Sequence, residues 1–431
     1  MNLEYFIARK LSFGTGSSFT KSIIKLAIAG IAIGIAVMII SSSIIRGFRN
    51  QITDKIFGFW GNIHITDLYI TNSNEPIAIK RDANLMEQIA NIDHIEYQEP
   101  RTVMGHEMGY MQSRTVAGVE SIQSYAMANG IIKTKKFLEG IVLKGVSDDY
   151  NWSKMNQYIV QGRKINTELD QSAKEIILSQ VTSQRLDIAL NDKLIVYFIK
   201  GGNTVKKAFK IVGIYKTGLE EYDRRIALVD IRKIREVLKW GEEEIAGYEV
   251  ITEHFDDMGI ISDHLYERVL PGNLYSQTIQ EKFPGIFEWL ELQKINEWVI
   301  MALMIGVCII NMITALIILI LERTKMIGVL KSLGHKNWDI RKIFLYQGGI
   351  IVIYGLFWGN LLGLGISLLQ KYTGFIKLDE KNYYLTEAPI EINWAMVSVI
   401  NISVLLLVIV CLILPTYIIA KIKPIKVLRF E

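Results

Sequence analysis

The sequence WVIMALMIGVCIINMITALIILIL, residues 298–321, is a charge-free apolar run that decides the fold class. A helix rises roughly 1.5 Å per residue, so about 20 apolar residues cross a hydrocarbon core of about 30 Å. A charge at the centre of such a run would cost about 2.5–3.5 kcal/mol on insertion scales. The stretch therefore predicts a transmembrane helix.

Three further runs have the same character, at residues 26–45, 343–370 and 392–420, and none contains Asp, Glu, Lys or Arg. The whole chain agrees with them, because 50% of its 431 residues are hydrophobic and only 21% are charged, against about 25% charged residues in soluble domains. The first run is too long for a signal peptide and has no convincing cleavage site, so we expect an uncleaved anchor. The sequence predicts four spans.

We expect an α-helical four-span membrane domain with an α+β domain inserted between spans one and two. The third and fourth runs are longer than a span requires, so we expect them to include interfacial residues. The predicted segments are a cytoplasmic amphipathic elbow (1–21), span one (22–46), the α+β domain (47–297), span two (298–321), a cytoplasmic coupling helix and loop (322–342), span three (343–370), an outer loop (371–391), span four (392–420) and a cytoplasmic tail (421–431).

Lys and Arg in short loops set the orientation of a membrane protein, since they stay on the cytoplasmic side. Residues 1–25 carry four of them against one acidic residue, residues 322–342 six against two, and residues 421–431 four against one. The loop at residues 371–391 carries three against four. This alternation predicts both termini in the cytoplasm and the α+β domain in the periplasm. It also accounts for most of the net charge of +4, so we expect no nucleic-acid partner.

The inserted region mixes strand and helix patterns. Strands are predicted at residues 62–66, 175–178, 194–198 and 209–214, with a hairpin turn at residues 201–203. Amphipathic helices are predicted at residues 82–92 and 230–238, each with an Asp at its start that would accept bonds from the first backbone N–H groups. The interleaving favours an α+β class.

The common catalytic motifs are missing from the sequence. There is no G-x-x-x-x-G-K-[ST] phosphate loop and no G-x-S-x-G nucleophile motif. His106 and Glu107 begin like a zinc-protease motif, but Tyr110 stands where the second histidine is needed. The two cysteines, Cys308 and Cys411, fall within spans. We expect no enzymatic activity, no metal and no cofactor bound by this chain.

Small residues recur every four positions in two spans, a pattern typical of closely packed membrane helices. Span one has a pair of glycines and span three has a ridge of three, which suit packing within the chain or across a dimer. These glycines are Gly30 and Gly34, and Gly355, Gly359 and Gly363. Asn311 and Asn360 are the most polar interior residues, and an interhelical hydrogen bond is their simplest role.

The cytoplasmic segment ERTKMIGVLKSLG, residues 322–334, differs from the four spans because it carries charged residues. Ile327, Leu330 and Leu333 recur near helical spacing, and Gly334 suits the end of a helix. A short amphipathic helix joined to two spans could be pushed by a partner protein. The alternative from the residues alone is a solvated interhelical loop.

This segment resembles the E-R-x-x-E-I-G-x-L-K-A-x-G signature of FtsX/MacB-type ABC-transporter permeases, with Met326 in place of the family's second acid. Matches to the lipoprotein-releasing (Lol) permeases run almost end to end and are short. They lie at residues 6–9, 46–48, 62–65, 144–146, 213–218 with 222–223, 311–313, 383–384, 388–390, 424 and 428–429.

The resemblance implies that a separate ABC ATPase, carrying ATP and Mg, docks on the coupling helix, and that two permease protomers, identical or different, form the unit. The residues it assigns to coupling are Glu322, Arg323, Lys325, Ile327, Gly328, Leu330, Lys331 and Gly334. It also implies that lipoprotein acyl chains enter between spans one and two and leave to a periplasmic carrier. The candidate substrate-facing residues are Ile35, Met38, Val299, Met304 and Asn311.

Some Lol permeases carry a long hook loop that recruits the carrier, and the corresponding turn here, residues 200–207, is short. Either the chain is the hookless partner of a heterodimer, or the carrier docks differently, or the substrate is not a lipoprotein. The leading hypothesis is a lipoprotein-releasing permease of the bacterial inner membrane. The alternatives are a mechanotransmitting permease of the same fold, for efflux or control of cell-wall hydrolases, and a membrane-anchored sensor or assembly protein without an ATPase.

Overall fold

The computed structural model describes residues 3–13, 18–69, 76–103, 106–134, 137–167, 174–200, 203–379 and 383–421. The chain forms two compact units. The helical unit comprises residues 1–51, 288–378 and 385–431, and the α+β unit comprises residues 52–287 and 379–384.

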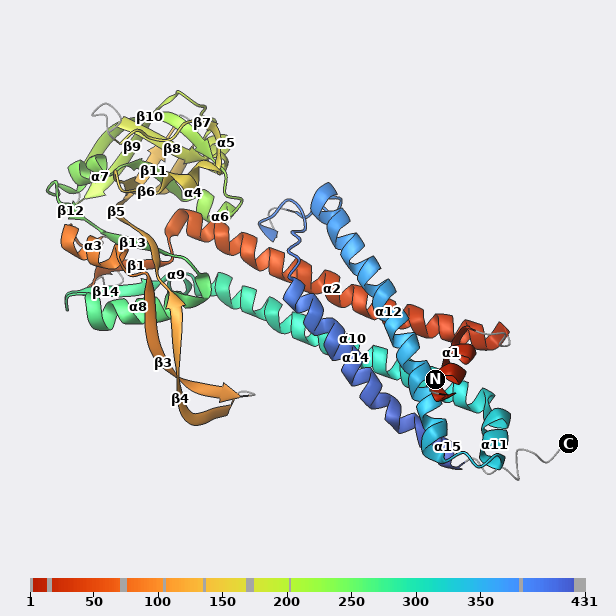
Figure 1. Ribbon diagram of the computed structural model, residues 1–431. Helices are drawn as coiled ribbons and strands as arrows, with labels where there is room; N and C mark the ends of the chain where they lie inside the picture. Colours follow the sequence, from red (N-terminus) through yellow and green to blue (C-terminus); the bar gives the residue numbers. More distant parts are fainter. Residues whose placement is uncertain are drawn as a thin grey trace. The chain divides into compact units, whose positions relative to one another are not determined.

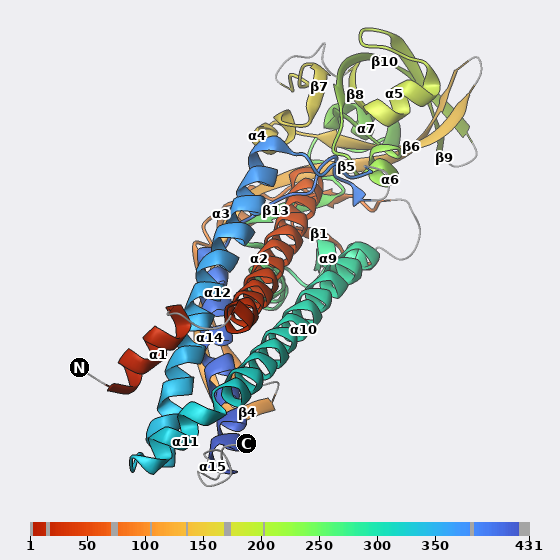
Figure 2. The same cartoon turned by 90° about the vertical axis from the view of Figure 1, so that its right-hand side faces the viewer.

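The helical unit contains the long apolar helices. Among the residues that the structure describes, four helices are long and apolar enough to cross a membrane, which agrees with the four predicted spans. Its described helices are α1 (Leu3–Phe13), α2 (Ser18–Trp60), α10 (Pro284–Glu322), α11 (Thr324–Ser332), α12 (Asn337–Thr373), α14 (Trp394–Thr416) and α15 (Ile418–Lys421). Figure 2 shows α2, α10, α12 and α14 running alongside one another.

Helices α2 and α10 are longer than the predicted spans. Helix α2 continues to Trp60, beyond the predicted end of span one at residue 46, and α10 begins at Pro284, before the predicted start of span two at residue 298. Hydropathy reports the apolar part of a helix, whereas polar residues of good helical propensity continue the same helix in water. Residues 52–60 of α2 and 284–287 of α10 belong to the α+β unit.

The core of the helical unit is made of aliphatic side chains from all four long helices. Ile31, Ile35 and Ile39 of α2, Leu316 of α10 and Val404 of α14 are fully buried in it. Helix α1 packs against α12, where the rings of Tyr5 and Tyr346 meet edge to face with centroids 5.9 Å apart. The predicted elbow at residues 1–21 therefore contains helix α1 and the start of α2.

The α+β unit is built on one large sheet. Its order is β14-β1-β13-β5-β6-β11-β8-β10-β7, with β9 paired to both β10 and β5. The strands of this sheet are β1 (Ile63–Asp67), β5 (Val119–Lys133), β6 (Leu138–Val146), β7 (Ile159–Gly162), β8 (Glu175–Ser179), β9 (Lys193–Lys200), β10 (Asn203–Tyr215), β11 (Ile226–Asp230), β13 (Gly247–Thr252) and β14 (Leu274–Thr278).

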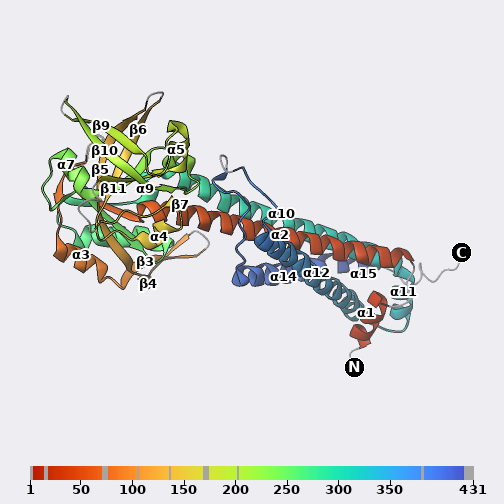
Figure 3. The same cartoon turned by 90° about the horizontal axis from the view of Figure 1, so that it is seen from above.

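Six of these strands form a closed ring of pairings, β5-β6-β11-β8-β10-β9 and back to β5 (Figure 3). The ring closes where Ile131 and Ile132 of β5 pair with Tyr197 and Val196 of β9. A Cβ at Gly130 would lie 2.6 Å from Val196 Cγ1, so glycine lets the strands approach there. Because β5 and β9 pair with each other, neither strand has a free edge where they meet. This pairing protects the sheet from pairing with other chains.

Two small sheets, seven short α-helices, a 3₁₀ helix (Phe255–Asp257) and a π-helix (Leu265–Val269) complete the described part of the unit. Strands β3 (His94–Val103) and β4 (His106–Ala117) form a two-stranded ribbon (Figure 1), and β2 (Ile79–Lys80) pairs with β12 (Glu244–Ile245). The helices are α3 (Ala83–Ala90), α4 (Trp152–Asn156), α5 (Gln180–Leu186), α6 (Glu220–Asp223), α7 (Ile231–Leu238), α8 (Met258–His264) and α9 (Ile279–Lys282).

The local predictions for this unit are confirmed. Asp82 and Asp230 cap α3 and α7, because their side chains accept bonds from Leu85 N and Arg232 N, respectively. The four predicted strands correspond to β1, β8, β9 and β10. Asn203 pairs with Lys200 across the predicted hairpin, while residues 201 and 202 of its turn lie outside the described residues.

Candidate coupling site

The segment at residues 322–334 is helical in the structure. Helix α10 ends at Glu322, and α11 runs from Thr324 to Ser332. Gly334 follows with a φ of +89°, a left-handed conformation that glycine adopts without steric cost. His335 N donates to Leu330 O at 3.1 Å, which satisfies one of the last carbonyls of the helix.

One side of α11 packs on the helical unit's own core. Ile327 is fully buried and Gly328 is buried with it, while Met326 and Leu330 pack against the same core. Lys331 Nζ donates to Ile419 O of α15 at 2.7 Å. Ile327 and Gly328 of the predicted coupling residues are thus buried against the spans, whereas Leu330 and Lys331 are partly exposed.

The junction between α10 and α11 is tied to the start of α2. The Thr20 hydroxyl donates to the Glu322 carboxylate, which links residues far apart in the sequence. Thr324 Oγ1 donates to Leu321 O at 2.5 Å across the same turn. Arg323 is the residue before α11 and is partly buried, and its side chain makes no capping bond to the helix. A force applied to α11 would thus reach both α10 and α2.

The outward side of α11 carries exposed apolar residues that lie outside the set the family resemblance assigns to coupling. Leu333 is 73% exposed, Val329 is 46% exposed and Trp338, at the start of α12, is 53% exposed. Lys325 is exposed on the same segment. The sequence could have indicated this surface, because these large apolar side chains stand in a short segment outside the predicted spans. Exposed apolar groups often mark contact surfaces.

The small residues of the spans face neighbouring helices within the chain. A Cβ at Gly34 would lie 2.6 Å from Cys308 Sγ, and one at Gly30 would overlap the Asn311 amide. Gly355, Gly359 and Gly363 of α12 lie against α2, where a Cβ at Gly359 would be 2.8 Å from Ile35 Cβ. Both glycine patterns thus bring α2 close to its neighbours.

The candidate substrate-facing residues do not share one surface. Ile35 and Met38 are fully buried in the helical core, whereas Val299 is half exposed and Met304 is partly buried. Asn311 Nδ2 donates to Ala27 O of α2 at 3.3 Å, and so bridges the first two long helices. A substrate could reach Ile35 or Met38 only after the helices separate.

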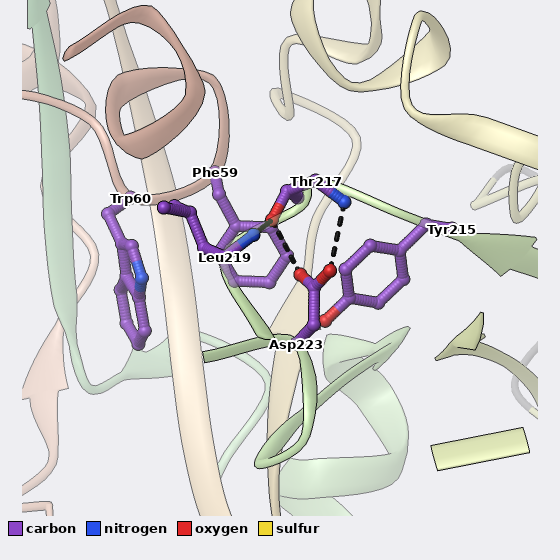
Figure 4. Close-up of a pocket in the computed structure, with 6 residues that line it drawn as sticks. All are labelled: Phe59, Trp60, Tyr215, Thr217, Leu219 and Asp223. Carbon is purple, nitrogen blue, oxygen red and sulfur yellow. Dashed lines mark hydrogen bonds between the residues drawn. The ribbon is translucent and has the colours of Figure 1, made fainter. Parts of the chain in front are cut away.

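A small cavity of about 10 Å³ lies beside the end of α2 in the α+β unit (Figure 4). Phe59, Trp60 and Leu219 line it, together with Tyr215, Thr217 and Asp223. Such a volume holds at most about one water molecule, so it is no substrate pocket. No group of three or more His, Cys, Asp or Glu among the residues that the structure describes is placed to hold a metal ion.

Asp223 organises the loop beside this cavity. Its carboxylate accepts bonds from Thr217 Oγ1 at 2.6 Å, Thr217 N at 3.0 Å and Gly218 N at 3.2 Å. Burial raises the pKa of Asp223 and these bonds oppose the rise. The short motif at residues 213–218 with 223 therefore builds a rigid turn; the side chain of Tyr222 lies outside the described residues.

Known families match most of the chain. Residues 26–254 match the MacB-like periplasmic core domain, and residues 298–424 match the FtsX-like permease C-terminal family. The first match alone covers more than half of the chain. Together with the long apolar helices found among its described residues, these matches make the protein a multi-pass ABC-transporter permease. The chain belongs to the FtsX/MacB-like permeases.

Curated relatives are similar over their full lengths. The lipoprotein-releasing system transmembrane protein LolC of Xylella fastidiosa is 21% identical over 100% of this chain and 98% of its own. LolC of Neisseria meningitidis serogroup B is likewise 21% identical, with the same coverage. LolE of Haemophilus influenzae, a protein of the same system, is 22% identical over 99% of both chains.

Among solved structures, the extracellular domain of the noncanonical ABC-type transporter YknZ from Gram-positive bacteria is similar to half of this chain. The match covers 50% of this chain and 98% of that domain, with 12% identity and a TM-score of 0.32.

Proposed function

We propose that this chain is a permease subunit of an ABC transporter that extracts lipoproteins from the inner membrane for delivery to the outer membrane. The observation that carries the proposal is the end-to-end similarity to proteins of the lipoprotein-releasing system. The similarity covers 98–99% of the length of these relatives, so it includes both the helical unit and the α+β unit.

In this proposal α11 is the docking helix for a separate ATPase, which binds ATP and Mg. The exposed side chains of Val329, Leu333 and Lys325 would contact the ATPase, and the buried Ile327 would pass the movement to the spans. Exposed apolar side chains of this kind often mark contact surfaces between proteins. Glu322 and Thr20 would carry the movement to α10 and α2 together.

The excess of Lys and Arg in residues 322–342 supports a cytoplasmic position for α11. With α11 in the cytoplasm, the α+β unit, which follows the first span in the chain, lies in the periplasm. Two protomers, identical or different, would form the transport unit. Acyl chains would then enter between the helices that carry Val299 and Met304 on one side and Ile35 and Met38 on the other, once ATP-driven movement separates them.

Leu333→Asp and Val329→Asp test the docking site. Each places a charge at an exposed apolar position, so the fold should persist while ATPase binding weakens by about tenfold or more, the usual cost of losing a central interface contact. Co-purification of the ATPase and lipoprotein-stimulated ATP hydrolysis measure this effect. Tyr372→Ser, at an exposed residue near the other end of α12, is the matched control and should behave as the wild type.

Full binding and stimulation in both Asp variants would rule out this surface as the docking site. A wild-type chain that forms no complex with any ATPase would favour the sensor or assembly role over transport.

A further inference from the structure

Three short motifs that match the Lol permeases meet at the end of helix α2. Residues 62–65 form the start of β1, residues 144–146 the end of β6, and residues 213–218 the end of β10 with its loop. They surround Phe59 and Trp60, the last two residues of α2, and the Phe59 and Tyr215 rings stack with centroids 5.5 Å apart.

The last carbonyls of α2 are bound by side chains from the sheet. Lys144 Nζ of β6 donates to Phe59 O at 2.6 Å, and His64 Nε2 of β1 bonds Trp60 O at 2.6 Å. Because a carbonyl only accepts, His64 carries its proton on Nε2. A cation at a helix C-terminus also opposes the partial negative charge of the helix dipole. Gly61, with a φ of +69°, ends the helix and turns the chain into β1.

Lys144 is fully buried together with its counter-ion. Its Nζ lies 2.7 Å from Glu249 Oε1 of β13, and both side chains are inaccessible to solvent. Gln123 Nε2 donates to Glu249 Oε2 at 2.7 Å. The rings of Phe59 and Trp60 lie 5.2 and 5.4 Å from Lys144 Nζ, within cation–π range. Burying two charges is costly, so a buried pair is a weak source of stability and a strong constraint on geometry.

The same cluster reaches the start of helix α10. Lys282, two residues before Pro284, directs its Nζ to His64 Nδ1 at 3.0 Å. The adjacent Phe283 ring packs on Trp60 with centroids 5.5 Å apart. Burial and the neighbouring Lys282 and Lys144 lower the pKa of His64 well below its usual value, so the ring is neutral and its Nδ1 accepts from Lys282.

We propose that Lys144, Glu249, His64 and Lys282, here called the anchoring cluster, fasten the end of α2 and the start of α10 to the sheet and pass movement of these two helices to the α+β unit. The inference rests on the proposed function, since it assigns positioning residues for the same transport cycle. A purely apolar socket would let the helix end rotate or slide, whereas two directed bonds to the final carbonyls fix its position relative to β1, β6 and β13.

The test uses the full permease–ATPase complex in lipid nanodiscs. Amide hydrogen exchange is measured by mass spectrometry with and without trapping by ATP and vanadate. In the wild type, trapping should change exchange in α2, α10, β1, β6 and β13. In the double variant Lys144→Met/Glu249→Gln, which removes both buried charges together, the change should persist in α2 and α10 and be lost from the strands. Lipoprotein release should fall by about tenfold, because the variant loses the charge-assisted bond from Lys144 Nζ to Phe59 O.

Arg163→Met is the matched control. It removes an ion pair of the same unit, Arg163 with Glu175 at 2.5 Å, that touches none of the anchoring cluster, and it should keep the wild-type response. If the double variant does not fold, His64→Phe replaces it, since Phe keeps the ring between Trp60 and Tyr125 and loses the bond to Trp60 O.

The proposal is overturned if a folded variant keeps the trapping response in β1, β6 and β13, or if the wild type shows no response there. Lipoprotein release, measured on the same samples, separates the two proposals. Trapping could change amide exchange in the wild-type strands but not in the variant, while the wild type releases no lipoprotein. That outcome would support the anchoring cluster and refute the lipoprotein cargo.

Discussion

The helical unit and the α+β unit bury polar groups in opposite ways. In the helical unit, Asn360 and Asn401 bond each other with neutral amides at 2.6 and 3.0 Å, and glycines bring helices together. The α+β unit instead buries the charged pair Lys144 and Glu249. Bonds between neutral side chains of membrane helices contribute little stability each, whereas removing one partner of a buried ion pair is strongly destabilising. The difference predicts that single substitutions cost most in the α+β unit.

The largest expected effect comes from breaking the charged pair on one side only. Lys144→Met leaves Glu249 buried without its counter-ion, which should lower the free energy of unfolding by about 3–5 kcal/mol. Denaturant unfolding of the purified chain, followed by tryptophan fluorescence, measures the loss. Lys144→Met/Glu249→Gln should recover most of it. A single variant within about 1 kcal/mol of the wild type would contradict the contrast between the units.

A second test concerns close packing in the spans. A Cβ at Gly359 would lie 2.9 Å from Ala32 O of α2, a backbone atom with little room to move. Gly359→Ala should therefore destabilise the helical unit by about 1–3 kcal/mol, as overpacking does. Gly365→Ala, on the same helix with nothing within 4 Å of the new Cβ, should be neutral or slightly stabilising. Thermal unfolding in detergent compares the two, and equal shifts would refute the packing role of Gly359.

The pH dependence of stability sharpens the description of the α+β unit. The pKa of His64 is lowered well below its ordinary value of 6.5, first by burial and then by Lys282. As the pH falls below about 6.5, the unfolded chain takes up a proton at this residue while the folded chain does not, so stability should fall. His64→Phe should show a shallower loss between pH 6.5 and pH 5, measured as midpoints of denaturant unfolding. An unchanged slope would show that His64 is not held neutral.

The smallest expected effect is at the amide pair of the spans. Asn360→Leu should cost about 0.6 kcal/mol, the average for interhelical hydrogen bonds in a membrane. Asn401→Leu should cost about the same, and the double variant little more, because both remove one interaction. A double-mutant cycle on thermal stability in detergent measures this coupling. Additive losses would show that the two amides act independently.

Periodic and local features of the fold were predictable from the sequence. Uninterrupted apolar runs located the four spans, Gly334 marked the end of α11, and Asp82 and Asp230 marked helix starts. Each depends on residues within a few positions of one another. The extension of α2 to Trp60 was not predicted, because hydropathy falls where a helix leaves an apolar environment even though its hydrogen bonding continues.

Long-range features were not predictable. The closure of the strand ring depends on pairing of Ile131 with Tyr197, which no local pattern encodes. The inward orientation of Ile327 and Leu330 depends on the spans that α11 covers. Lys144 gave one overlooked signal: a lysine within the apolar strand IVLKGV. A charged residue at such a position is expected to have a buried partner, but the identity of Glu249 requires the structure.

The central claim is tested most directly by depleting this protein and separating inner from outer membranes. Acylated lipoproteins and integral outer-membrane proteins are then followed in both fractions. The account predicts that lipoproteins accumulate in the inner membrane while other outer-membrane proteins at first reach their destination. Normal lipoprotein sorting after depletion, in cells without a second permease of this kind, would contradict it.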